Sequence, residues 1–227
     1  MNNNKNNNII IAIDRQFGSG GLEIARKVAE YYKISCYDRE LLAKTAQESG
    51  FTEELIQTQD EMPGSSFIFS LIADTFSEMP IHEDVFFAQQ ETIRKIARES
   101  ENGFVIVGRC ADVALRRHKN LIKIFIHAPE SFRMDRIRAG KAGDNPEYKN
   151  QSDEKILELM RKKDKERWSY YDYYSQQRWG QAKNYDFTIN SGLLGIDGSV
   201  SQILNIIDAF VKNGGEKQWM QKESRSS

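Results

Sequence analysis

The feature that most constrains the fold is a short apolar run that leads through a glycine-rich turn into an amphipathic helix. Ile9–Ile13 is apolar at every position, which is typical of a strand buried on both faces of a parallel sheet. The turn Gly18–Gly21 follows it. Apolar residues at helical spacing then mark a helix: Leu22, Ile24, Ala25, Val28 and Ala29. Strand, glycine turn and helix in this order open a βα unit.

Further apolar runs predict further strands, separated by helices. We expect strands at 34–37, 104–107, 121–127 and 185–190. We expect helices at 39–49, 83–99, 153–168 and 196–211, another that begins after Pro129, and a helical stretch from Thr52. Segment 62–80 is apolar but broken by proline and glycine, and 139–151 is predicted to be a loop. The alternation predicts an α/β fold with an open parallel sheet, whose ligands bind at the carboxyl ends of the strands.

Composition favours a globular protein of one domain. The chain has 227 residues, 39% of them apolar, and we expect the domain to span 9–212, between an asparagine-rich tail at 1–8 and a tail at 213–227. The 32 Lys and Arg balance 33 Asp and Glu, which disfavours a globally basic nucleic-acid binder. No apolar run reaches the roughly 18 residues of a membrane span. Cys36 and Cys110 are too few for a disulfide framework, so we expect a cytoplasmic protein with no membrane partner.

The glycine-rich turn is a candidate phosphate cradle. Gly18, Gly20 and Gly21 let backbone N–H groups turn inward at the positive end of a helix, and Ser19 adds a hydroxyl donor. A tight structural turn would need the same small residues, so both interpretations stand. A standard phosphate loop reads G-x-x-x-x-G-K-[ST], and Gly21 stands where its Lys would be. Another cation must then supply that charge, and Arg15 is the nearest in sequence.

Several segments together resemble the cytidylate-kinase-like family. Asp14–Ala25 is similar to the family's opening, S-R-x-x-G-S-G-G-x-x-I-A. The resemblance continues at Tyr37–Leu42, Val105–Asp112, Ile124–Pro129 and Tyr185–Asn190, and covers most of 9–210. It implies a three-layer P-loop kinase fold with a five-stranded parallel sheet and a helical lid at about 140–180. It also implies transfer of the γ-phosphoryl of ATP, with Mg²⁺, to a nucleoside monophosphate, and leaves the metal ligands unknown.

The resemblance also assigns substrate-binding residues. Arg39 falls near the family's monophosphate-binding segment. Arg109 matches the Arg of the G-R-D motif, which contacts substrate phosphate in true cytidylate kinases. Cys110 replaces the Asp of that motif, and Asp112 is the nearest acid. Each arginine also has a structural interpretation: an ion pair for Arg109, and a solvated first-turn helix residue for Arg39.

The charged helix at 153–168 falls in the implied lid, where Arg161, Asp164 and Arg167 are candidate residues. We take Arg15, Arg109 and Arg167 as the candidate catalytic cations, because a guanidinium stays charged and binds phosphate through two N–H groups. A charged helix face is also typical of plain solvated surface. Aromatic residues around the lid can stack on a base, although packing or an oligomer interface is the commoner role: Trp168, Tyr170, Tyr171, Tyr173, Tyr174 and Trp179.

Three functional hypotheses follow. The first is a kinase that acts on a nucleoside monophosphate. The second is a nucleotide- or phosphate-binding sensor or assembly module without turnover, which the missing Lys favours. The third keeps the phosphotransferase and changes the acceptor to another phosphorylated metabolite or a small alcohol. An exposed apolar surface at 62–80 would favour a homodimer.

Overall fold

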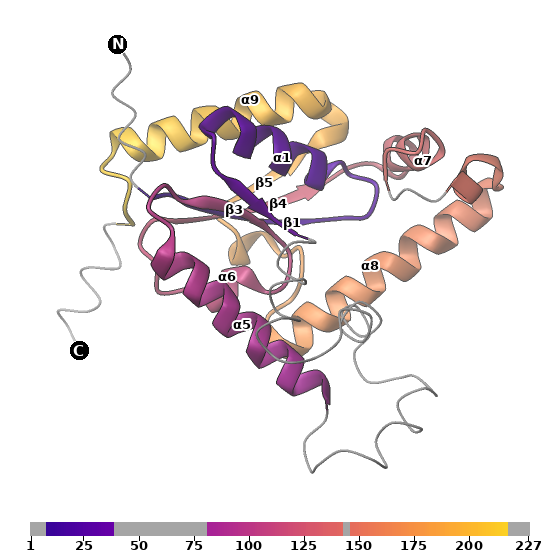
Figure 1. The fold of residues 1–227 in the computed structure, drawn as a ribbon. Coiled ribbons are helices and arrows are strands. Elements are labelled where there is room, and N and C mark those ends of the chain that lie inside the picture. The colour runs from indigo at the N-terminus through magenta and orange to yellow at the C-terminus, as the bar shows by residue number, and fades with distance from the viewer. Residues whose placement is uncertain (1–7, 39–80, 143–145, 218–227) are drawn as a thin grey trace.

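A five-stranded parallel sheet forms the centre of the molecule (Figure 1). The computed structural model describes residues 8–38, 81–142 and 146–217. The strands are β1 (Ile10–Arg15), β2 (Ser35–Tyr37), β3 (Phe104–Val107), β4 (Leu121–His127) and β5 (Phe187–Asn190), in the order β2-β3-β1-β4-β5. Every neighbouring pair is parallel. The predicted α/β fold with a five-stranded parallel sheet is therefore confirmed.

Helices cover both faces of this sheet and make the three predicted layers. In Figure 1, α1 (Gly21–Tyr32) and α9 (Ser191–Lys212) lie on one face, and α5 (Ile81–Glu99) and α6 (Ala111–Ala114) lie on the other. The longest helix of the described residues, α8 (Asp153–Ser175), runs from this body towards α7 (Glu130–Arg138). Short 3₁₀ turns lie at Pro146–Asn150 and Ala182–Asn184. The carboxyl edge of the sheet thus faces the α7–α8 region.

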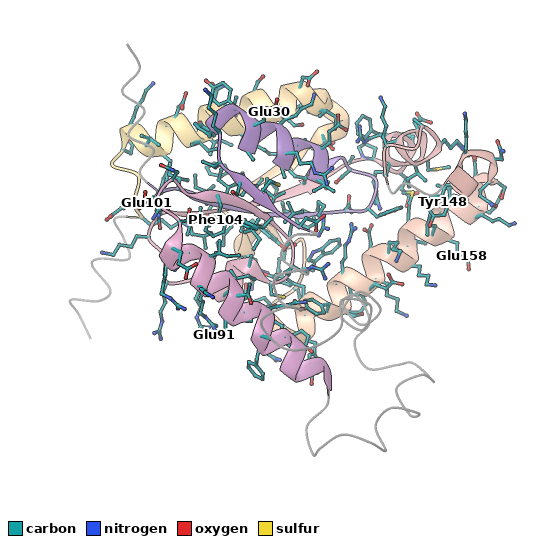
Figure 2. All side chains as sticks on the ribbon, viewed as in Figure 1. Glu30, Glu91, Glu101, Phe104, Tyr148 and Glu158 are labelled. Carbon is teal, nitrogen blue, oxygen red and sulfur yellow. The ribbon has the colours of Figure 1, made fainter. Side chains whose placement is uncertain are left out.

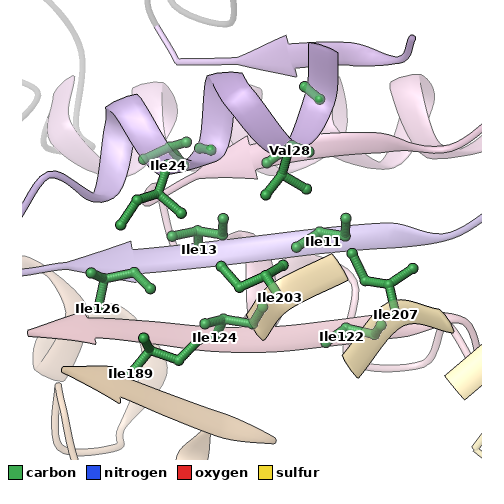
Figure 3. Close-up of a cluster of buried hydrophobic side chains, with 14 of the residues drawn as sticks. Ile11, Ile13, Ile24, Val28, Ile122, Ile124, Ile126, Ile189, Ile203 and Ile207 are labelled. Carbon is green, nitrogen blue, oxygen red and sulfur yellow. The ribbon is translucent and has the colours of Figure 1, made fainter. Parts of the chain in front are cut away.

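The core follows from the two-residue period of the strands. Alternate residues of β1, Ile11 and Ile13, pack with Ile24 of α1 and with Ile203 and Ile207 of α9 (Figure 3). The intervening residues, Ile10 and Ala12, face the cluster that α5 and α6 cover. Charged side chains lie on the outer faces of the helices, as Figure 2 shows for Glu30, Glu91 and Glu158. Both faces of β1 are buried, as the uninterrupted apolar run predicts.

Two helices extend well beyond their predicted bounds. The helix predicted at 153–168 continues to Ser175, so the tyrosines after Trp168 lie on α8 itself. The reason is tertiary, because Tyr170 and Tyr174 pack against Phe86 of α5. The closing helix begins at Ser191, five residues early, since the Asn190 side chain caps it by accepting from two backbone N–H groups. It kinks at Gly195.

Helix α9 has the length and hydropathy of a membrane span, and among the described residues no other helix does. Length and composition alone are weak evidence for a span, because core helices pass the same test. Ile203 and Ile207 of α9 are buried in the core against α1 and the sheet. The helices predicted at 39–49 and from Thr52, and segment 62–80, lie outside the described residues.

Candidate functional site

The loop between β1 and α1 has the backbone that its glycines predict. Gly18 and Gly20 take φ angles of 81° and 82°, and Gly20 precedes the first turn of α1. Ser19 is fully buried; its hydroxyl donates to the Gln16 carbonyl, and its own carbonyl accepts from the Ser191 hydroxyl. These bonds fix the loop at the helix N-terminus, where an anion is favoured. The Ser19 hydroxyl therefore donates its hydrogen bond to the backbone of the loop.

Gly21 has a steric reason to be glycine. A Cβ atom at Gly21 would lie 2.4 Å from the Cβ of Arg15, so the stem of Arg15 fills the space that a lysine would need there. Arg15 then runs away from the loop. Its Nη1 lies 2.5 Å from where a Cβ would stand on Gly108, and its Nη2 is 3.9 Å from Asp38 Oδ1. The guanidinium therefore lies at the end of β3.

Three arginines line one small cavity at the carboxyl ends of β1 and β3. Arg15 comes from β1, Arg109 from the turn after β3, and Arg167 from α8. The structure thus brings together the three arginines that the sequence marks as candidate catalytic cations. The rest of the lining is Asp14, Gly108, Cys110, Tyr170, Tyr171 and Trp179.

The turn that carries Arg109 is strained. Gly108, Arg109 and Cys110 have φ angles of 75°, 63° and 52° in succession. This left-handed backbone costs a non-glycine residue on the order of 1–3 kcal/mol and is found most often at functional sites. The Gln90 amide donates to the Arg109 carbonyl at 3.1 Å and helps to hold the turn. Burial lowers the pKa of Arg109 to about 10, so the side chain stays charged at neutral pH.

Two buried carboxyl groups at this end of the sheet interact with each other. Asp14 is 9% exposed and Asp112 is 7% exposed. The Tyr185 hydroxyl donates to Asp14 Oδ2 at 3.0 Å, and the Tyr171 hydroxyl donates to Asp112 Oδ2 at 2.6 Å. Burial, followed by the charge of Asp112, raises the pKa of Asp14 to about 7. Asp14 lines the cavity, whereas Asp112, the predicted substrate-binding acid, does not.

Helix α8 contacts the loop between β1 and α1 directly. Asp164 Oδ1 accepts a hydrogen bond from the Phe17 backbone N–H at 2.7 Å, and Oδ2 of the same carboxylate is paired with Arg133. Arg167 donates to the Arg15 carbonyl at 3.1 Å and lies over the Phe17 ring. A carboxylate of the predicted lid thus binds where the loop could bind an anion. It is bound by the Phe17 amide and by the Arg133 guanidinium together.

Two arginines of α7 at this loop were missed by the sequence analysis. Arg133 is 5% exposed, and its Nε donates to the Phe17 carbonyl at 2.6 Å. Arg136 is 7% exposed and pairs with Glu23 at 2.6 Å. The guanidinium carbon of Arg136 is 3.2 Å from where a Cβ would stand on Gly20. Their signal in the sequence was the Arg-x-x-Arg spacing just after a predicted strand.

Other predicted site residues lie elsewhere. Arg161 is exposed on α8 and does not line the cavity. Arg39 lies outside the described residues. Cys110 is buried, and Cys36 is partly exposed. The preferred packing role of the aromatic residues fits Tyr170, Tyr171, Tyr174 and Trp179, while Trp168 and Tyr173 are 45% and 55% exposed.

No group of three or more His, Cys, Asp or Glu side chains able to hold a metal ion occurs within residues 8–38, 81–142 and 146–217. Glu23 lies in the first turn of α1, close to the loop, and its carboxylate is bound to Arg136. Mg²⁺ usually keeps several waters and is bound by one or two carboxylates together with substrate phosphates, so it does not require a cluster of three protein ligands.

The sequence matches the model of the cytidylate kinase-like family over residues 10–193. A crystal structure of an uncharacterized protein from Eubacterium ventriosum is 31% identical, covers 88% of this chain and 98% of its own, and has a TM-score of 0.64. Shikimate kinase from Bacteroides thetaiotaomicron is similar in fold at 13% identity, with a TM-score of 0.52 over 88% of this chain and 98% of that one. No curated protein matches the sequence. The fold is that of the P-loop kinases.

Proposed function

The chain belongs to the cytidylate kinase-like family, and on that premise we propose that it is a phosphotransferase. It would move the γ-phosphoryl of ATP to a nucleoside monophosphate or a related small acceptor. The observation that carries this proposal is the convergence of Arg15, Arg109 and Arg167 on one cavity beside a glycine-rich loop. Phosphoryl transfer requires alignment of donor and acceptor, and cations where negative charge spreads.

The donor phosphates would bind at the loop and the N-terminus of α1. Backbone N–H groups of 18–21 and the helix dipole favour an anion there. Arg136 lies beside Gly20, and Arg133 beside Phe17, so these two side chains supply positive charge where the loop lacks its lysine. Mg²⁺ would arrive with ATP and neutralise part of the phosphate charge.

The acceptor would bind in the cavity of the three arginines. Arg109 would hold its anionic group, as would Arg39 if that residue reaches the site. Arg15 and Arg167 would offset the charge that develops on the transferring group. Asp164 must leave the loop amide before a phosphate can take its place, so nucleotide binding would shift α8.

A second candidate is a nucleotide-binding sensor or assembly module without turnover. Two observations favour it: the Arg15 stem blocks a lysine at Gly21, and Asp164 already holds the loop amide as an anion would. Tight nucleotide binding with no phosphoryl transfer to any acceptor would select this candidate.

Calorimetric titration with MgATP, followed by an ADP-release assay over a panel of monophosphates, tests the proposal. Release stimulated by one acceptor establishes a kinase. We expect Arg109→Ala to lower kcat/KM by about 10²-fold or more, as the loss of a charged phosphate contact does. Arg98→Ala, at an exposed arginine of α5 outside the cavity, is the matched control and should keep wild-type turnover. Full turnover in Arg109→Ala would refute the assignment.

The expected surroundings of the protein are also proposals. We expect a cytoplasmic enzyme whose partners are a nucleotide and a small acceptor, with no membrane or nucleic acid. The homodimer predicted from 62–80 concerns a segment outside the described residues. Sedimentation at several protein concentrations tests it.

A further inference from the structure

Asp14 is a buried acid in the cavity that the arginines line, and phosphate binding gives it no role. We infer that the acceptor of this site is a hydroxyl group on a small anionic molecule, and that Asp14 takes the proton of that hydroxyl. This inference rests on the proposed phosphoryl transfer from ATP. In a monophosphate acceptor, a phosphate oxygen would attack the γ-phosphorus of ATP. In the acceptor inferred here, an alcohol oxygen attacks instead.

Asp14 lies where its carboxyl group could contact the hydroxyl oxygen of a bound acceptor. It is the next-to-last residue of β1, and the glycine-rich turn Gly18–Gly21 begins four residues later. Its Oδ2 is held by the Tyr185 hydroxyl, and its Oδ1 lies 3.9 Å from where a Cβ would stand on Gly108. The carboxyl group therefore lies next to the turn after β3, on the strand that leads into the glycine-rich turn. An acceptor held by Arg109 would enter at this place.

A carboxylate at this place discriminates between acceptor types. The phosphate of a monophosphate has a second pKa near 6, so most of it is already ionised at neutral pH and needs no base. A neighbouring carboxylate would repel it. An alcohol oxygen holds its proton at neutral pH and needs a base to attack. The arginines would then bind the acceptor's separate anionic group and the transferring phosphoryl.

The proposed step balances without a further reactant. The acceptor oxygen forms a bond to the γ-phosphorus of ATP as the bond from that phosphorus to the β,γ-bridging oxygen breaks. The hydroxyl proton passes to a carboxylate oxygen of Asp14, and ADP leaves with the bond's electron pair. The products are a phosphate monoester, ADP and a protonated Asp14, which releases its proton to water.

The surroundings of Asp14 keep it ready to accept a proton near neutral pH. Burial and the charge of Asp112 raise its pKa to about 7, against the opposing effects of Arg15, Arg167 and the Tyr185 hydroxyl. Cys110 and Tyr171 also face it, and burial raises the pKa of both, so neither carries charge at neutral pH. A base that titrates near the working pH transfers protons most effectively.

The cavity is large enough to admit water. Its volume is about 30 Å³, and a buried water needs roughly 10–15 Å³ of such space. Water can therefore act as the smallest acceptor of this site. Slow hydrolysis of ATP by water therefore reports on the same base, before any acceptor has been identified.

The first test is the pH profile of ATP hydrolysis without acceptor, from pH 5.5 to 9, by ADP release. We expect the wild-type rate to rise with pH and level off above about 7. Asp14→Asn should lower the plateau by about 10²-fold or more and remove the rise, with MgATP affinity within about twofold of wild type. Asp197→Asn, an exposed acid paired with Lys27, is the matched control and should retain the wild-type profile.

The second test identifies the bond in the product by ³¹P NMR. Glycerate is compared with propionate, and glycerol 1-phosphate with inorganic phosphate, so each pair differs in its hydroxyl groups; CMP is included. We expect an ester resonance only with hydroxyl-bearing anions. A diphosphate resonance from CMP at a rate unchanged in Asp14→Asn overturns this inference and leaves the proposed function standing. No ADP release in any mixture, water included, overturns both.

Discussion

Replacing Asp14 by asparagine should make the protein more stable at neutral pH while it removes the proposed base. In the folded protein, burial raises the pKa of Asp14 from 3.8 to about 7. The folded state therefore keeps a proton that the unfolded chain releases between these two values. Stability falls with rising pH wherever the folded state binds more protons, so ionisation of Asp14 destabilises the wild type between pH 4 and 7.

The size of the effect follows from the shift. One pKa unit corresponds to about 1.4 kcal/mol, so a shift of roughly three units gives about 4 kcal/mol at pH 8. This is an upper bound, because Asp112 titrates together with Asp14 and shares the effect. Asparagine has nearly the same shape, and its side-chain oxygen can still accept from the Tyr185 hydroxyl. The variant should match the wild type near pH 4, where both side chains are neutral.

Urea denaturation followed by circular dichroism, at steps from pH 4 to pH 8, measures this difference. We expect the free energy of unfolding of Asp14→Asn to exceed that of the wild type by an amount that grows from near zero to several kcal/mol. Asp197→Asn should show no such growth, because its carboxylate is exposed beside Lys27. A difference between Asp14→Asn and wild type that stays constant from pH 4 to 8 would refute the raised pKa and the burial argument behind it.

Three further predictions concern the loop and the core. Arg136→Ala should weaken ATP binding by about 10- to 100-fold, since charge-assisted hydrogen bonds contribute about 1.5–3 kcal/mol, and should barely change AMP binding. Calorimetry checks this, with Arg138→Ala as control, because Arg138 is a partly exposed arginine of the same helix that is paired with Asp153. Asp164→Asn should tighten ATP binding by about tenfold, or about 1.4 kcal/mol. The reason is that the nucleotide no longer displaces a carboxylate from the Phe17 amide. Weaker ATP binding in this variant would show that the carboxylate helps to bind the nucleotide. Ile203→Ala should lower the free energy of unfolding by about 2–5 kcal/mol in urea with an unchanged slope, because it leaves a cavity between α9 and the sheet.

Much of the fold was predictable because its signals are local. An uninterrupted apolar run such as Ile9–Ile13 is stable only as a strand buried on both faces, and that requirement already implies a parallel sheet covered by helices. Gly18 and Gly20 mark the loop because they supply the positive φ angles of the turn. The end of α8 was not predictable in this way. Its tyrosines neither favour nor disfavour a helix strongly. The helix continues through them because they pack against Phe86 of another helix.

The candidate site was likewise predictable only in part. The sequence by itself determined which residues stand at the carboxyl ends of the strands, and so named Arg15 and Arg109 among the candidates. Only the tertiary structure decided where each side chain goes: Arg15 turns from the loop to the end of β3, and Arg136 arrives from α7 to lie beside Gly20. A residue's position along the chain fixes its strand or helix. Its charge acts on neighbours brought close by packing, and those neighbours are far away in the sequence.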